Sequence, residues 1–116
     1  MRLYWGPVVT GAVAGFVLGS VLGLVISGFI PDSAGRQVLL VLLSFVIELG
    51  AGFLAGRFSP DSQALNGSQS ALLLYLVASM IALTNGANLL VLIIGATLAL
   101  AIGTMGGILA VVAETE

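Results

Sequence analysis

The chain of 116 residues contains no cysteine, no histidine and no lysine, and only 7% of its residues are charged. Without cysteine the chain has no disulfide, thiolate metal site or thiol nucleophile, and without histidine it lacks the commonest metal ligand and general base. Its three arginines are far apart in the sequence. They form neither a basic patch for nucleic acid nor a polybasic run for anionic lipid. We therefore expect no metal, no cofactor and no nucleic-acid partner.

Apolar residues dominate what is present, at 59% of the chain. A soluble domain typically carries about 25% charged residues. A soluble domain this small has too high a surface-to-volume ratio to hide so much apolar surface. A lipid bilayer removes that difficulty by acting as the apolar solvent. The composition therefore predicts an integral membrane protein, with one transmembrane domain over residues 1–116.

Charges and turn residues divide the chain into segments of the length that a membrane-spanning helix needs, about 20 mostly apolar residues. Pro7 suits the first turn of a helix, and Pro31 ends the first segment. The residue types at positions 84–88 are typical of a tight turn. The first segment is too long for the apolar part of a signal peptide, so we expect a retained helix. The predicted fold is an all-α antiparallel bundle of transmembrane helices with glycine-zipper packing. The predicted helices cover residues 7–30, 37–57, 68–84 and 89–113.

Four crossings would put both termini on one side of the membrane. That side would hold Arg2, Arg57, Asp61, Glu114 and Glu116, and the other side Asp32 and Arg36. Cytoplasmic loops carry an excess of Lys and Arg. The side with the termini holds two arginines and the amino terminus, whereas the other side holds one arginine. This difference predicts cytoplasmic termini. So small a bias is also typical of proteins that insert both ways up, so dual topology stays open.

Small residues recur at every fourth position in three of the predicted helices. Residues four apart lie on one helix face, and faces without side chains let backbones approach closely in a bilayer. The pattern predicts tight helix contacts, either inside the bundle or with a second copy or another membrane protein. The glycines concerned are Gly11, Gly15, Gly19, Gly23, Gly52, Gly56, Gly95, Gly103 and Gly107.

Glu48 is the one charged residue inside a predicted membrane span. An ionised carboxylate at that depth costs several kcal/mol, about 3 on insertion scales. We therefore expect the Glu48 side chain to be neutral and to face the protein interior. Ser44 and Gly52 share its helix face. Glu48 is either a proton- or cation-binding group on a transport path or a hydrogen-bonding contact between helices. Residues at similar depth complete the candidate proton or ion site: Ser44, Ser20, Tyr75, Ser79 and Thr104.

The sequence lacks a nucleophile–base pair, a metal-ligand cluster and a phosphate-binding glycine loop, so we expect no enzyme activity. Gly-Ala-Gly-Phe-Leu-Ala-Gly-Arg at residues 50–57, followed by Asn66-Gly67 opening a helix that contains Tyr75, resembles a group of small membrane proteins. These are largely uncharacterised four-helix proteins of bacteria and archaea with a glycine-rich second helix ending in Ala-Gly-Arg. The resemblance covers about residues 45–80. It implies a prokaryotic inner-membrane protein and supplies no activity.

Two functional hypotheses follow from these features. The first is an accessory or self-assembling membrane subunit that docks through its glycine faces, as a homo-oligomer or within a larger membrane complex. The second is a small oligomeric channel or ion- or proton-coupled transporter that uses Glu48.

Overall fold

The computed structural model describes residues 2–114 and is helical throughout except for short connections. Each helix is long and apolar enough to cross a membrane. Even the shortest, with 22 residues, is about 33 Å long at 1.5 Å per residue, and a hydrocarbon core is about 30 Å thick. The prediction of an all-helical chain with membrane-length helices is confirmed. The helices are α1 (Trp5–Phe29), α2 (Ala34–Phe58), α3 (Gln63–Thr84) and α4 (Leu89–Glu114).

The helix boundaries differ from the predicted ones mainly at two starts. α2 begins at Ala34 because Ser33 caps it, accepting a hydrogen bond from the backbone N–H of Arg36 at 3.2 Å. α3 begins at Gln63, five residues before the predicted start at Ser68. The prediction was wrong there because the polar character of residues 66–70 disfavours an early start of a membrane span, although four of these five residues are buried within α3. Glu116, which the prediction places beside the termini, lies outside the described residues.

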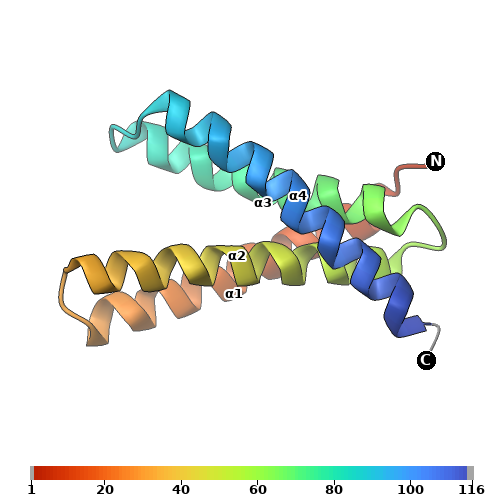
Figure 1. Ribbon diagram of the computed structural model, residues 1–116, viewed down its shortest axis with the longest axis horizontal. Helices are drawn as coiled ribbons and strands as arrows, with labels where there is room; N and C mark the ends of the chain where they lie inside the picture. The colour runs from red at the N-terminus through yellow and green to blue at the C-terminus, as the bar shows by residue number, and fades with distance from the viewer. Residues whose placement is uncertain (1, 115–116) are drawn as a thin grey trace.

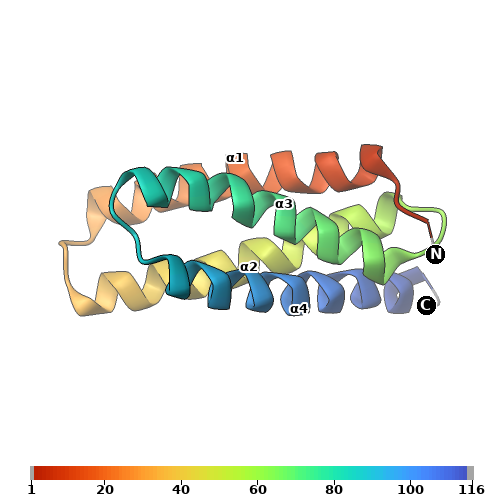
Figure 2. The same cartoon turned by 90° about the horizontal axis from the view of Figure 1, so that it is seen from above.

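Both termini and the α2–α3 connection lie at one end of the molecule, and the other two connections lie at the opposite end (Figure 1). At the terminal end the helices pack together. Toward the opposite end the α1–α2 pair and the α3–α4 pair spread apart, as Figure 1 shows. Figure 2, seen from above, shows α1 and α4 on opposite sides of the molecule. α1 packs on α2 and α3, and it makes no contact with α4 within the described residues. The longest dimension is 42 Å, which matches a bilayer including its headgroups, about 40–45 Å.

Small side chains fill the interior of this bundle, and large ones cover its outside. Most of the buried apolar residues are alanines, including Ala55, Ala71 and Ala99, none of which has any exposed surface. By contrast, Leu24 is 75% exposed and Phe29 85% exposed. Water would penalise such an outer surface, whereas lipid tails would solvate it. The distribution therefore fits helices that face lipid.

Hydrogen bonds from two polar residues hold the ends of α1. At the terminal end, buried Asn66 accepts from the backbone N–H of Tyr4 at 2.6 Å and donates to the carbonyl of Arg2 at 3.0 Å. At the opposite end, the Arg36 guanidinium donates to the carbonyl of Ile30 at 3.2 Å and pairs with Asp32 at 3.4 Å. These contacts satisfy backbone groups that a helix end leaves without partners.

Candidate functional site

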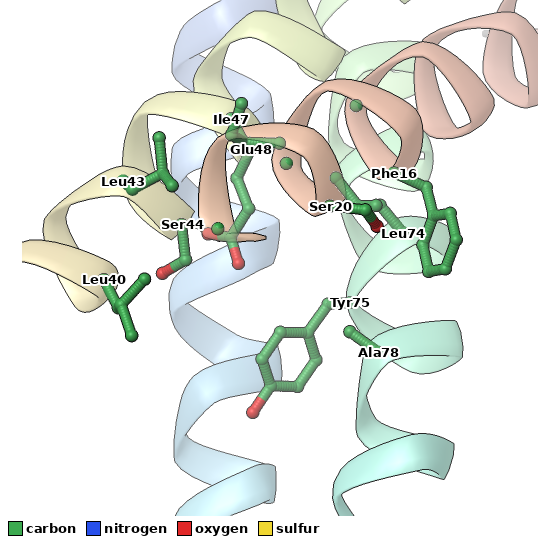
Figure 3. A pocket seen from close by; sticks show the side chains of 13 residues that line it. Phe16, Ser20, Leu40, Leu43, Ser44, Ile47, Glu48, Leu74, Tyr75 and Ala78 are labelled. Carbon is green, nitrogen blue, oxygen red and sulfur yellow. The ribbon is translucent and has the colours of Figure 1, made fainter. Parts of the chain in front are cut away.

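A pocket of about 320 Å³ lies between α1, α2 and α3, in the half of the molecule where the two helix pairs spread apart. It is open on one side and mostly apolar. Glycines of α1 form part of its wall, so that backbone rather than side chains bounds that part of the pocket. Figure 3 shows the pocket from close by. Its lining residues are Gly15, Phe16, Gly19, Ser20, Gly23, Leu40, Leu43, Ser44, Ile47, Glu48, Leu74, Tyr75 and Ala78.

Glu48 is the only charged residue in this lining. Its side chain projects from the middle of α2 into the pocket, toward the space beside the Tyr75 ring (Figure 3). The residue is only 5% exposed, and its Oε2 atom is fully shielded without a hydrogen-bond partner. A buried acceptor left unpaired costs about 1–3 kcal/mol. The carboxyl group is therefore held in a place where the chain itself does not stabilise it.

Two of the three hydroxyl groups in the lining, those of Ser44 and Tyr75, are engaged with the backbone. The Ser44 hydroxyl donates to the carbonyl of Val41 at 2.7 Å, one turn earlier in α2. The Tyr75 hydroxyl reaches α4 and donates to the carbonyl of Leu92 at 2.9 Å. Because each hydroxyl has one hydrogen to donate, neither is free to donate to Glu48 in this arrangement.

The structure brings together part of the predicted site. Ser20, Ser44 and Tyr75 line the pocket with Glu48, while Ser79 and Thr104 are not among its lining residues. The Thr104 hydroxyl donates to the carbonyl of Leu100 within α4 at 2.7 Å. The Ser79 hydroxyl is buried without a partner. None of these hydroxyls donates to Oε2 of Glu48, which has no hydrogen-bond partner in the part of the chain that the structure describes.

Apolar residues of the pocket were not found by the sequence reasoning. Phe16, Leu43 and Leu74 carry no sign that separates them from lipid-facing residues of the same kind. Phe16 is four residues from Ser20, so helical spacing from that candidate residue could have indicated it. Leu43 and Leu74 directly precede Ser44 and Tyr75 in the sequence, and adjacent residues do not share a helix face, so no such signal was available for them.

Two glycines of α2 lie against glycines of α4. A Cβ atom on Gly52 would lie 2.8 Å from the Cα atom of Gly103, and one on Gly56 would lie 3.0 Å from that of Gly107. Side chains cannot occupy such spaces without a shift of the backbone. Gly95 instead faces the Tyr75 ring of α3, where an added Cβ would overlap the phenol.

The glycine series of α1 is packed at one end only. A Cβ on Gly11 would meet the carbonyl oxygen of Ala51 at 2.5 Å, and one on Gly15 would meet Leu74 at 2.8 Å. Gly19 has only Ile47 nearby, at 3.5 Å, and Gly23 has no atom within 4 Å. The series thus passes from close helix contact at the terminal end to the open pocket.

Two further glycines in close contact were not singled out in the sequence. A Cβ on Gly106 would meet the backbone nitrogen of Phe53 at 2.7 Å, and one on Gly67 would meet the backbone of Gly103 and Gly107. Gly67 stands in the polar segment at residues 66–70, just before the predicted start of the helix at residue 68. Gly67 and Ala71 are one helical turn apart, and this spacing of small residues is the sequence signal that indicates a shared helix face.

Comparisons of the chain with known protein families, with characterised proteins and with solved structures found no match. What the structure supports is the class: a helical chain with four helices able to cross a membrane and a carboxyl-bearing pocket among three of them.

Proposed function

We propose that this chain is a small membrane transport protein, either a channel or a carrier, in which Glu48 takes up a proton or a cation inside the pocket. One observation carries the proposal: Glu48 is only 5% exposed, lines a 320 Å³ pocket and has a carboxyl oxygen without a hydrogen-bond partner among the described residues. Ionisable residues inside membrane spans are rare and mark ion or proton paths. Uptake of a proton or of a cation would give this oxygen the partner that it lacks.

The competing role for Glu48, a hydrogen-bonding contact between helices, has less support. Such a contact needs a partner on another helix, and Oε2 has none among the described residues. The available hydroxyls of Ser44 and Tyr75 serve backbone carbonyls instead. Retaining an unpaired carboxyl costs stability, and natural proteins accept such costs mainly at functional sites.

In the proposed arrangement the four helices form an antiparallel transmembrane bundle in a prokaryotic inner membrane, held by close glycine contacts. The end with Arg2, Arg57 and the amino terminus faces the cytoplasm, following the bias of positive charge. The pocket then lies in the half of the bundle away from the cytoplasm, between the spread helix pairs. A homo-oligomer would shield the apolar sides of this opening.

The test is ion flux in liposomes that contain the purified protein. We expect a proton or monovalent-cation flux, driven by an imposed potential, that Glu48→Gln abolishes, because the amide cannot bind and release a proton or hold a cation. Gly50→Ala is the matched control, since a Cβ there meets nothing within 4 Å. Circular dichroism and gel filtration check that both variants fold. Equal flux from the unmodified chain and the Gln variant would refute the proposal.

A second candidate function, a self-assembling or accessory subunit, is favoured by the open glycines of α1. Gly23 and Gly28 meet nothing within 4 Å in the chain itself. Gly52 and Gly56 of α2, however, lie against Gly103 and Gly107 of α4, so these glycines are not available to a partner. Within the predicted glycine series, docking would therefore use the end of α1 near the α1–α2 connection. Its test is the oligomeric state in lipid, with a variant at Gly23.

A further inference from the structure

The pocket has a size and a composition that fit a particular class of ligand. We propose that it binds a monovalent organic cation with an apolar body, with the Glu48 carboxylate as the counter-charge. The inference rests on the proposed transport function and names the class of substrate for it.

Volume is the first argument. A volume of about 320 Å³ is far above the roughly 10–15 Å³ that a cavity needs to hold one water molecule. Pockets for small organic molecules begin at about 300 Å³. A bare inorganic ion would leave most of this space to be filled by water against apolar walls. An organic molecule can fill it.

The polar groups of the lining are the second argument. They are one carboxylate and the hydroxyls of Ser20, Ser44 and Tyr75. Dehydrated hard cations such as Mg²⁺ and Ca²⁺ need about six or more oxygen ligands. Two of these hydroxyls already donate to backbone carbonyls, which fixes their orientation. The set is too small to replace the hydration shell of such an ion, but one carboxylate suffices for an organic cation.

The apolar and aromatic walls are the third argument. Phe16 and Tyr75 are the aromatic residues of the lining, the Tyr75 ring lies beside the space that the Glu48 side chain enters, and leucines and Ile47 provide most of the other side chains. A quaternary ammonium group is attracted to an aromatic face within about 6 Å. The lining contains no arginine that would repel a cation. A single negative charge selects one positive charge over two and rejects anions.

The position of the pocket is the fourth argument. It opens on one side, in the region where the α1–α2 and α3–α4 pairs diverge (Figure 1). The outer surface around this opening is apolar and faces lipid tails. A cation with an apolar body gathers at the boundary between headgroups and tails, with its apolar part among the tails, and from there it can enter the opening without crossing a polar channel.

The experiment compares two ligands of the same shape. Benzyltrimethylammonium carries a fixed positive charge, and neopentylbenzene is its neutral carbon isostere. Binding to the full chain in lipid nanodiscs is measured by saturation-transfer NMR and calorimetry, with empty nanodiscs as background. We expect the cation to bind at least about tenfold more tightly than the isostere, equivalent to about 1.4 kcal/mol. We expect Glu48→Gln to remove this preference, and Glu48→Asp, which keeps the charge, to retain it.

Equal affinity for the cation and the isostere, or a cation affinity that Glu48→Gln leaves unchanged, would overturn the inference. Equal affinity would indicate a pocket for lipid tails or for an apolar segment of a second copy. The flux assay on the same preparations separates the two proposals. Glu48-dependent flux without charge-selective binding overturns the organic cation and keeps the transport function. Charge-selective binding without flux keeps the ligand class and overturns transport.

Discussion

The side-chain oxygen of Asn66 accepts a hydrogen bond from the backbone N–H of Tyr4 at 2.6 Å, across 62 positions of sequence. Asn66 has no exposed surface, and its amide donates to the carbonyls of Arg2 and Ser62. One turn further along α3, the buried Ser70 hydroxyl donates to the carbonyl of Val8 at 2.8 Å. One face of α3 therefore fixes the start of α1, at the end of the molecule where the helices pack most closely.

Asn66→Ala should destabilise the chain substantially. The change removes the partners of a backbone N–H and of carbonyl groups at a buried position, and each buried group left unpaired costs about 1–3 kcal/mol. We expect a loss of about 2–4 kcal/mol, measured by unfolding in mixed micelles with increasing SDS. Asn85→Ala is the control, because Asn85 makes its side-chain bond in an exposed turn. Equal losses for the two variants would contradict the role of Asn66.

Gly52→Ala should lower the stability of the chain, whereas Gly50→Ala should leave it unchanged or raise it, although the two positions are only two residues apart in α2. A methyl group on Gly52 would press on the backbone of Gly103, whereas one on Gly50 meets nothing within 4 Å. Overpacking typically costs about 1–3 kcal/mol. Replacing an uncrowded helical glycine by alanine is neutral or stabilising, by up to about 1 kcal/mol in water. Thermal unfolding in detergent measures both. A tolerated Gly52→Ala would show that α2 and α4 do not meet there.

The fold class could be predicted from the sequence because the apolar composition alone indicates membrane-spanning helices. Long apolar stretches between Pro31, Arg57 and the turn at residues 84–88 predict helices of membrane length, and the helices end close to those positions. The start of α3 could not be placed, because polar residues usually indicate a loop between membrane spans. Here Asn66 and Ser70 are buried and hydrogen-bond the start of α1, a tertiary contact that local sequence does not record.

The candidate site could be predicted only in part. Glu48 is conspicuous as the single charge in a span, and helical spacing adds Ser44. The pocket itself depends on how far the α1–α2 and α3–α4 pairs diverge, and no residue pattern encodes that angle. Depth alone placed Thr104 and Ser79 beside Glu48, although neither is among the residues that line the pocket. Equal depth does not establish contact, because it leaves the rotation of each helix open.

Leucine at two positions of the α1 glycine series should separate folding from assembly. Gly15→Leu should unfold the chain or greatly lower its stability, because even a Cβ there would crowd Leu74. Gly23→Leu should leave monomer stability unchanged, since that position is open. If copies associate through this end of α1, Gly23→Leu lowers the dimer fraction counted by single-molecule photobleaching in liposomes. An unchanged dimer fraction would remove Gly23 from the interface.

The proposed orientation predicts a labelling pattern that is simple to obtain, because the chain has no cysteine of its own. Single cysteines at Ser33 and at Asn88 lie in or next to the two connections opposite the termini. In intact cells both should react with a membrane-impermeant maleimide, whereas Ser62→Cys, beside the termini, should react only after lysis. Reaction at all three positions in intact cells would indicate that copies insert both ways up.

Glu48→Met should stabilise the chain or leave its stability unchanged, and this distinguishes a functional carboxyl from a structural one. Methionine is similar in length, fills irregular apolar spaces, and removes a shielded oxygen that has no partner. Replacing such a group by an apolar one is commonly neutral or stabilising, here by up to about 1–3 kcal/mol. The measurement is SDS-induced unfolding of the Met variant beside Glu48→Gln. A loss above about 1 kcal/mol for the Met variant would show that the carboxyl holds helices together. A gain in stability with loss of flux would show that the chain keeps Glu48 at the expense of its own stability, as expected for a group that serves transport.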